Sequence, residues 1–184
     1  MVGYYRVVED DELPGLELAS ALNVSAEFGR ELRNTGAWPT DPALPRWKLA
    51  RAELTDLVPV LDALLVCSPR LREVLDQYAV PETLDWREVE VVDRDDAGHQ
   101  YWAYRWAGPS LALGDDPSAY RTSGVPMEVF AEEQIKDYQV FGRGGPFAYM
   151  TLIVSERVRA ELLTMGVTGV RFAPPRIKPS PSGK

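Results

Sequence analysis

Acidic side chains beside the one histidine of the chain are the first residues to consider for chemistry. Asp93, Asp95 and Asp96 crowd one short segment, and His99 follows it. Carboxylates near a histidine can carry out acid–base catalysis or bind a metal ion. The spacing differs from the Asp-x-Asp-x-Asp-Gly pattern of a calcium loop, and aspartates in turns often bond their own backbone. We therefore expect a surface turn that can contact a protein partner, and no metal site.

Two further acidic pairs lie between residues 114 and 133. They are Asp115 with Asp116 and Glu132 with Glu133. The segment is long and polar, and core packing does not explain it, which is typical of loops that carry function. The complete set of candidate partner-binding residues is Asp93, Asp95, Asp96, His99, Asp115, Asp116, Glu132 and Glu133.

The chain contains no marked reaction centre. Cys67 ends an apolar run, so we predict a buried thiol, and a single cysteine excludes an intramolecular disulfide. The glycine-rich residues 142–145 precede a predicted strand, whereas a phosphate-binding loop precedes a helix. We therefore expect a protein that is not an enzyme and needs no cofactor. A hydrolase that uses carboxylates near His99 is the less favoured alternative.

Two segments repeat one pattern and must position many of these residues. Residues 63–75 and 151–162 each contain an apolar run, then a serine, then x-Arg-(Leu/Val)-Arg-x-x-Leu. A serine before an apolar helical pattern is an N-cap signal. We therefore predict a strand–Ser–helix–strand unit that occurs twice as an internal repeat. The aligned pairs are Ser68 with Ser155, Arg70 with Arg157, Arg72 with Arg159 and Leu75 with Leu162.

The paired arginines lie two residues apart on each predicted helix. They point to different sides of the helix and cannot form one phosphate clamp. We interpret them as solvated side chains or as members of ion pairs within the fold. The functional alternative is that one arginine of each pair docks onto the sheet or onto a partner.

The remaining elements complete an α+β fold with a mixed, mostly antiparallel sheet. Alternating residues at 84–92 and 100–106, separated by the turn at 95–98, predict a β-hairpin with aromatic cross-strand pairs. Residues 13–59 contain several prolines and give no clear assignment. Further predicted strands are residues 2–8, 46–50, 129–130, 137–141, 147–154 and 167–173, and the predicted helices are residues 69–78 and 156–165.

Length and charge limit the organisation and the partners. The 184 residues suit one α+β domain over residues 1–173, or two packed halves of about 1–107 and 108–173, with residues 174–184 as a disordered tail. No apolar run is long enough for a membrane helix, and the N-terminus is not a signal peptide, so we expect a cytoplasmic protein. The net charge of −8 argues against a nucleic-acid partner and permits a basic protein partner.

The C-terminal half resembles a family of bacterial immunity proteins. The residues that carry the resemblance are Tyr4-Tyr5, the segments 68–75, 137–141 and 152–158, and the closing Gly166-Val167-Thr168-Gly169-Val170-Arg171-Phe172. This family belongs to polymorphic toxin systems and is well represented in myxobacteria. The resemblance spans most of the chain, is weak at residues 13–55, and rests on scaffold motifs, so it implies no toxin-binding residue.

The resemblance implies a function in kin discrimination. Such proteins bind and neutralise one cognate toxin, which is often delivered by contact-dependent or type VI secretion. Several of these toxins are nucleases, and an acidic inhibitor suits a basic nuclease groove. We therefore expect an inhibitor that occludes the active site or substrate groove of a toxin. The alternative is an interaction or scaffold domain, for which an exposed edge strand at residues 100–106 would support strand addition or dimerisation.

Overall fold

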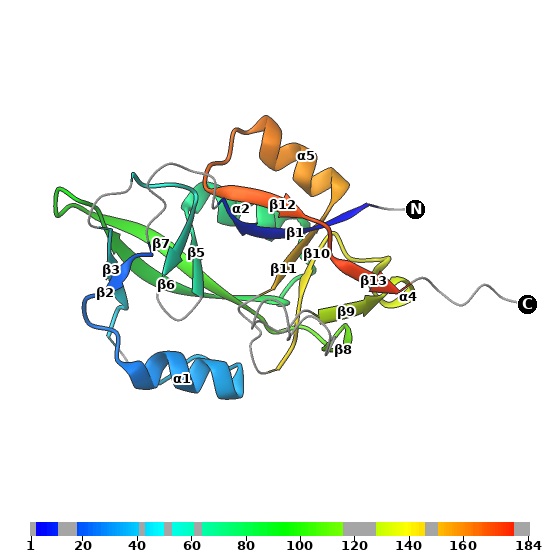
Figure 1. Cartoon of the computed structure of the whole chain (residues 1–184), viewed down its shortest axis with the longest axis horizontal. Helices are drawn as coiled ribbons and strands as arrows, with labels where there is room; N and C mark the ends of the chain where they lie inside the picture. The colour runs from blue at the N-terminus through cyan, green and yellow to red at the C-terminus, as the bar shows by residue number, and fades with distance from the viewer. Residues whose placement is uncertain are drawn as a thin grey trace, which may run out of the picture.

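The computed structural model of the chain describes residues 3–10, 18–40, 43–49, 53–60, 64–115, 128–145 and 151–178. It has helices and extensive, mostly antiparallel sheets, which confirms the predicted α+β class. Among the described residues, no helix has the length and apolar character that a membrane-crossing helix needs. Figure 1 shows the arrangement of the elements along the long axis of the molecule.

The largest sheet has six strands in the order β2-β3-β6-β7-β5-β4. Its neighbours pair antiparallel except for β3 and β6, which are parallel. The alternating residues of β6 and β7 form the predicted hairpin, with Trp86 opposite Tyr104. The strands are β2 (Ser20–Ala21), β3 (Arg46–Lys48), β4 (Leu57–Val60), β5 (Leu64–Cys67), β6 (Leu84–Val92) and β7 (Gly98–Trp106).

Two smaller sheets contain the other strands. A four-stranded sheet has the order β10-β11-β1-β12, and a three-stranded sheet has the order β13-β9-β8. The first consists of β1 (Tyr4–Glu9), β10 (Val140–Gly142), β11 (Leu152–Ser155) and β12 (Val170–Ala173). The second consists of β8 (Ala112–Asp115), β9 (Glu128–Ala131) and β13 (Arg176–Lys178).

Serine caps set the starts of the three longer helices. These helices are α1 (Ala26–Thr35), α2 (Pro69–Tyr78) and α5 (Glu156–Thr164), and a fourth, α4 (Glu132–Ile135), is one turn long. The hydroxyls of Ser25, Ser68 and Ser155 accept from the backbone N–H three residues on. Each hydroxyl satisfies a donor that has no partner within the helix. The predicted helices at residues 69–78 and 156–165 are therefore confirmed.

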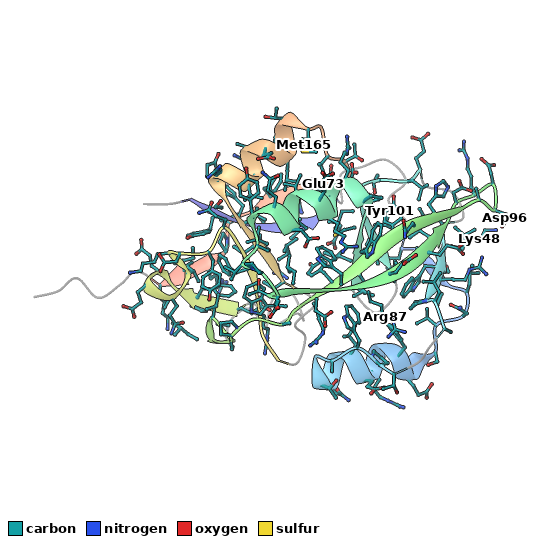
Figure 2. All side chains as sticks on the ribbon, turned by 180° about the vertical axis from the view of Figure 1, so that it is seen from behind. Lys48, Glu73, Arg87, Asp96, Tyr101 and Met165 are labelled. Atoms are coloured by element: carbon teal, nitrogen blue, oxygen red, sulfur yellow. The ribbon has the colours of Figure 1, made fainter. Side chains whose placement is uncertain are left out.

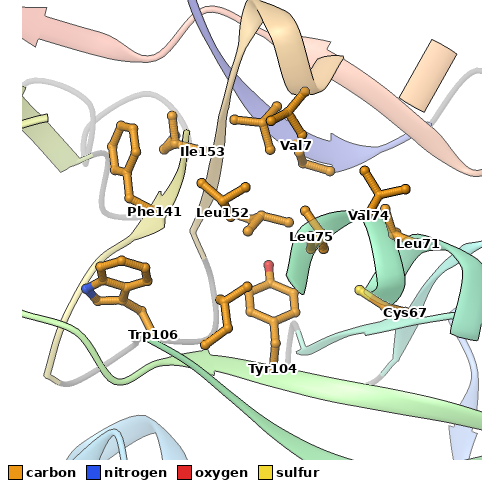
Figure 3. Packing of buried hydrophobic residues seen from close by; sticks show 14 of the residues in the cluster. Val7, Cys67, Leu71, Val74, Leu75, Tyr104, Trp106, Phe141, Leu152 and Ile153 are labelled. Atoms are coloured by element: carbon orange, nitrogen blue, oxygen red, sulfur yellow. The ribbon is translucent and has the colours of Figure 1, made fainter. Parts of the chain in front are cut away.

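The two faces of the six-stranded sheet belong to two different cores. Phe28 and Leu32 of α1 pack on one face, around the fully buried Trp47. Leu71, Val74 and Leu75 of α2 occupy the other face, where they meet residues of the four-stranded sheet. Figure 3 shows this second core, with Tyr104 and Cys67 below α2 and Val7 and Leu152 beyond it. The alternation of side chains along β5 serves both cores, because Leu64 and Val66 face one and Leu65 and Cys67 the other.

Several sequence predictions differ from the structure. Residues 100–106 do not form an edge, because β7 lies between β6 and β5 inside the sheet. The segment assigned to a disordered tail contains β13, which pairs in parallel with β9. The proline-rich residues 13–59 contain α1, which the sequence analysis did not identify. The predicted strand at residues 147–154 appears as β11, and residues 146–150 lie outside the described part.

Candidate functional site

The β6–β7 hairpin carries the acidic turn that the sequence analysis selected. Asp93 organises this turn: its Oδ1 accepts from the N–H groups of Asp95 at 2.9 Å and Ala97 at 3.0 Å. Its Oδ2 lies 2.7 Å from Nε2 of His99. These contacts lower the pKa of Asp93, with the His99 bond as the main cause and the backbone bonds next. Asp93 and His99 therefore hold the turn in shape, as turn aspartates commonly do.

The other two acids of the turn point into solvent. The side chains of Asp95 and Asp96 are 81% and 77% exposed. Asp96 adopts a left-handed backbone with φ 63°, and its carboxylate forms an ion pair with Lys48 of β3. Figure 2 shows Asp96 at the far end of the hairpin, beside Lys48. Arg94 lies in the same turn, with its Nε 3.8 Å from Oδ2 of Asp95. The turn thus presents three carboxylates and one arginine, and we define residues 93–97 as the acidic tip.

Two further candidate acids are not brought to this tip. Glu132 and Glu133 begin α4, which lies at the opposite end of the long axis (Figure 1). Asp115 ends β8, but its side chain and all of Asp116 lie outside the described residues. Of the candidates whose side chains the structure describes, Asp93, Asp95, Asp96 and His99 lie together at the tip, and Glu132 and Glu133 lie elsewhere.

Cys67 is buried as the sequence analysis predicted. Its side chain is 0% exposed in the core below α2. Burial is the main cause that raises the pKa of the thiol far above its usual range. Because the thiolate is the reactive form, this cysteine is a packing residue and no nucleophile.

A buried carboxylate that the sequence analysis missed has the densest set of polar contacts. Asp56, just before β4, is 7% exposed. Its Oδ1 accepts from the Ser68 hydroxyl at 2.6 Å and from Nε of Arg70 at 3.2 Å. Its Oδ2 accepts from Nη2 of Arg70 and from both the N–H and the hydroxyl of Thr168.

These contacts keep Asp56 ionised although it is buried. Burial is the largest single influence and would raise its pKa, but the hydrogen bonds from Arg70, Ser68 and Thr168 together outweigh it and lower the pKa to about 2. A carboxylate offers about four acceptor positions, and five donors already occupy those of Asp56. Asp56 has no free acceptor position for a substrate proton, so we interpret its contacts as stabilising the fold.

The four repeated arginines are also used inside the fold. Arg72 lies over the rings of Trp86 and Trp102, and Arg159 lies over Tyr5 and Phe172. Arg157 lies 5.1 Å from the centre of the Tyr78 ring. Arg70 donates to the carbonyls of Met165 and Gly166 at 3.2 and 3.1 Å, in addition to its contact with Asp56. Arg72 and Arg159 also form ion pairs within the fold, with Asp76 and Glu156. For these two arginines the predicted ion pairs and the alternative of docking onto the sheets therefore both hold.

In the part of the chain that the structure describes, no group of three or more histidine, cysteine, aspartate or glutamate side chains is placed to hold an ion. The second buried carboxylate, Glu128, accepts a 2.6 Å bond from the Thr151 hydroxyl and lies near Arg143. Like Asp56, it serves the packing of the sheets.

The missed residues left weak signals in the sequence. Asp56 is a lone acid directly before the apolar residues of β4, a position where an unpaired charge would be costly. Its partner Thr168 is 112 residues away, so no local pattern connects the two.

Comparison of the chain with models of protein families gives no match, and no curated protein matches it significantly.

Proposed function

We propose that this chain is an immunity protein that binds a cognate antibacterial toxin and blocks its active site or substrate groove. The observation that supports it is the acidic tip: two exposed carboxylates at the end of a long hairpin, in a turn held by Asp93 and His99. A pre-shaped acidic projection suits a basic groove, because little conformational entropy is lost when it binds. The toxin, its secretion route and a cytoplasmic site of action remain parts of this proposal.

Co-expression with the product of the neighbouring toxin gene tests the proposal. We expect a complex that survives purification, together with rescue of growth in cells that express the toxin. Absence of both the complex and the rescue would contradict the immunity function.

A matched pair of charge reversals tests the surface. Asp95→Lys changes the charge of the tip, and Glu73→Lys makes the same change on the exposed face of α2, away from the tip (Figure 2). Both residues are exposed, so neither change should affect folding. We expect Asp95→Lys to weaken the complex and Glu73→Lys to leave it intact. Equal behaviour of the two variants would remove the tip from the interface while leaving toxin inhibition itself to the co-expression experiment.

A further inference from the structure

The chain contains two sets of strands with the same neighbours and the same directions. In the first set, β2 pairs antiparallel with β3, β3 is parallel to β6, and β4 pairs antiparallel with β5. In the second set, β8 pairs antiparallel with β9, β9 is parallel to β13, and β10 pairs antiparallel with β11. Strands β12 and β13 together match β6, because only Pro174 and Pro175, which lack the N–H of a ladder, separate them.

The central strand of each set comes from the other half of the chain. β7 follows the first set in sequence, yet it lies between β5 and β6, antiparallel to both. β1 precedes the first set, yet it lies between β11 and β12, antiparallel to both. The sheet of each set is therefore completed by a central strand whose chain belongs to the other set.

The register of the pairing matches as well. Since Ser68 aligns with Ser155, Cys67 aligns with Val154, and their partners are Trp102 of β7 and Tyr5 of β1. Two residues further along these central strands, Tyr104 lies opposite Trp86 and Val7 lies opposite Phe172. The positions that the two arginine stacks occupy are therefore equivalent, with Trp102 and Trp86 under Arg72, and Tyr5 and Phe172 under Arg159.

The capping serines make the same contacts in both sets. The N–H of Ser68 donates to the Asp56 carbonyl at 2.8 Å, and its hydroxyl donates to the Asp56 side chain at 2.6 Å. The N–H of Ser155 donates to the Gln139 carbonyl at 2.8 Å, and its hydroxyl donates to the Gln139 side chain at 2.6 Å. Asp56 and Gln139 each precede the strand that pairs with the strand before the helix.

The two helices contact each other reciprocally. Arg70, two residues after its cap, binds carbonyls at the end of α5. Arg157, two residues after the equivalent cap, lies over Tyr78 at the end of α2. In an interface with twofold symmetry, a residue i of one unit contacts residue j of the other, and the equivalent contact from j to i is also present. The two helices show such a reciprocal pair of contacts.

We infer that the chain is a covalently joined dimer of one unit, with copies at residues 3–92 and 98–178. Each copy places its first strand in a slot of the other copy's sheet. The interaction surface is this slot, between β5 and β6 in one copy and between β11 and β12 in the other. Its partner is a strand from a second copy of the unit that carries a tyrosine at an equivalent position, because Tyr101 and Tyr4 both donate to a backbone carbonyl beside the slot.

The copies differ in two of their connections among the described elements. α1 lies between β2 and β3, while the second copy has a shorter connection between β8 and β9, and the second copy has α4 between β9 and β10. The acidic tip at residues 93–97 is the join between the copies. This inference does not depend on the proposed toxin inhibition.

A circular permutant of the full chain tests whether the two copies can exchange their order. The new ends lie between Asp95 and Asp96, and Lys178 is joined to Met1 by a copy of the five-residue turn Asp-Arg-Asp-Asp-Ala. In the native chain this five-residue turn joins Val92 to Gly98, so the same turn should serve the equivalent join if the two copies are interchangeable. We expect a cooperative fold whose folding equilibrium constant in urea titration stays within about tenfold of the parent chain, because only loop terms change. A control joined by two residues should be much less stable.

A five-residue permutant that is unfolded, or no more stable than the two-residue control, would overturn the inference. A second experiment uses the native order. A protease site is inserted in residues 93–97, and the folded full chain is cut there. We expect both fragments to elute together and to separate only in denaturant, with the amides of β1 and β7 equally protected from hydrogen exchange. Separation in buffer, or loss of protection in β1 alone, would contradict the exchange of strands.

Discussion

Asp56 stays charged in the interior because its donors come from two separate parts of the chain and together fill its acceptor positions. Ser68 and Arg70 belong to the start of α2, and Thr168 precedes β12. The contact therefore ties the first copy to the loop after α5 in the second. A buried charge with full hydrogen bonding is stable only while every partner is present.

Asp56→Asn should reduce stability and change its pH dependence. The pKa of Asp56 is about 2 in the folded chain against 3.8 for the ordinary carboxyl, so the folded state favours the ionised form. This stabilisation is fully present above about pH 4 and is lost as the pH falls through about 2, and it amounts to about 2 kcal/mol. We expect urea titrations between pH 2 and pH 6 to show that the difference between wild type and Asp56→Asn shrinks toward low pH. The exposed Asp95→Asn is the control, and a pH-independent difference would contradict the assignment.

Substitution of Arg72 by lysine tests whether the arginine stacks depend on contact between the flat guanidinium and the aromatic rings. Arg72→Lys keeps the charge but loses the flat guanidinium that covers Trp86 and Trp102. We expect a loss of about 1 kcal/mol in the free energy of unfolding and a change in tryptophan fluorescence. Arg159→Lys should cost a similar amount without the tryptophan signal, because its rings are Tyr5 and Phe172. Unchanged fluorescence in Arg72→Lys would show that the stack does not persist in solution.

At the scale of elements, local signals define some segments and not others. The helix of residues 69–78 and the β6–β7 hairpin were predictable, because a cap, a proline at the first turn and alternating residues are all local. α1 was missed because only Phe28 and Leu32 mark its buried face, although Ser25 and the left-handed Gly36 cap its two ends. The central place of β7 was not predictable, since its neighbour β5 lies far away in sequence. The acidic tip was found from composition, whereas the site at Asp56 depends on long-range contacts.

Substitution of the three capping serines by alanine separates two contributions to stability, that of the helix cap and that of the buried side-chain hydrogen bond. Ser25 caps an exposed helix start, while the hydroxyls of Ser68 and Ser155 also donate to side chains inside the fold. We expect Ser25→Ala to cost about 1 kcal/mol, and Ser68→Ala and Ser155→Ala about 2 kcal/mol each. Urea denaturation of the three variants measures the order. Equal losses would mean that the contacts to Asp56 and Gln139 add nothing beyond the cap.

At the scale of the whole molecule, the distribution of charge should affect how fast a basic partner binds. The net charge is −8, and the acidic tip projects at one end of the long axis (Figure 2). Opposite charges accelerate encounter, and salt screens them over about 8 Å at physiological ionic strength. We expect the association rate constant with the proposed toxin to fall several-fold between 50 and 500 mM salt, and Asp95→Lys to flatten this dependence. Stopped-flow binding measures both, and a rate that does not respond to salt would contradict an electrostatic role for the tip.

The position of β1 has a consequence for the order in which the protein can form during synthesis. Tyr4 pairs with Ser155 and Val7 with Phe172, so β1 leaves the ribosome long before either neighbouring strand exists. The six-stranded sheet can assemble once β7 has emerged, but the four-stranded sheet must wait for β12. Contacts this distant in sequence slow folding and leave an unpaired strand exposed to wrong partners in the meantime. The nascent chain therefore carries this segment without its partner strands through most of translation.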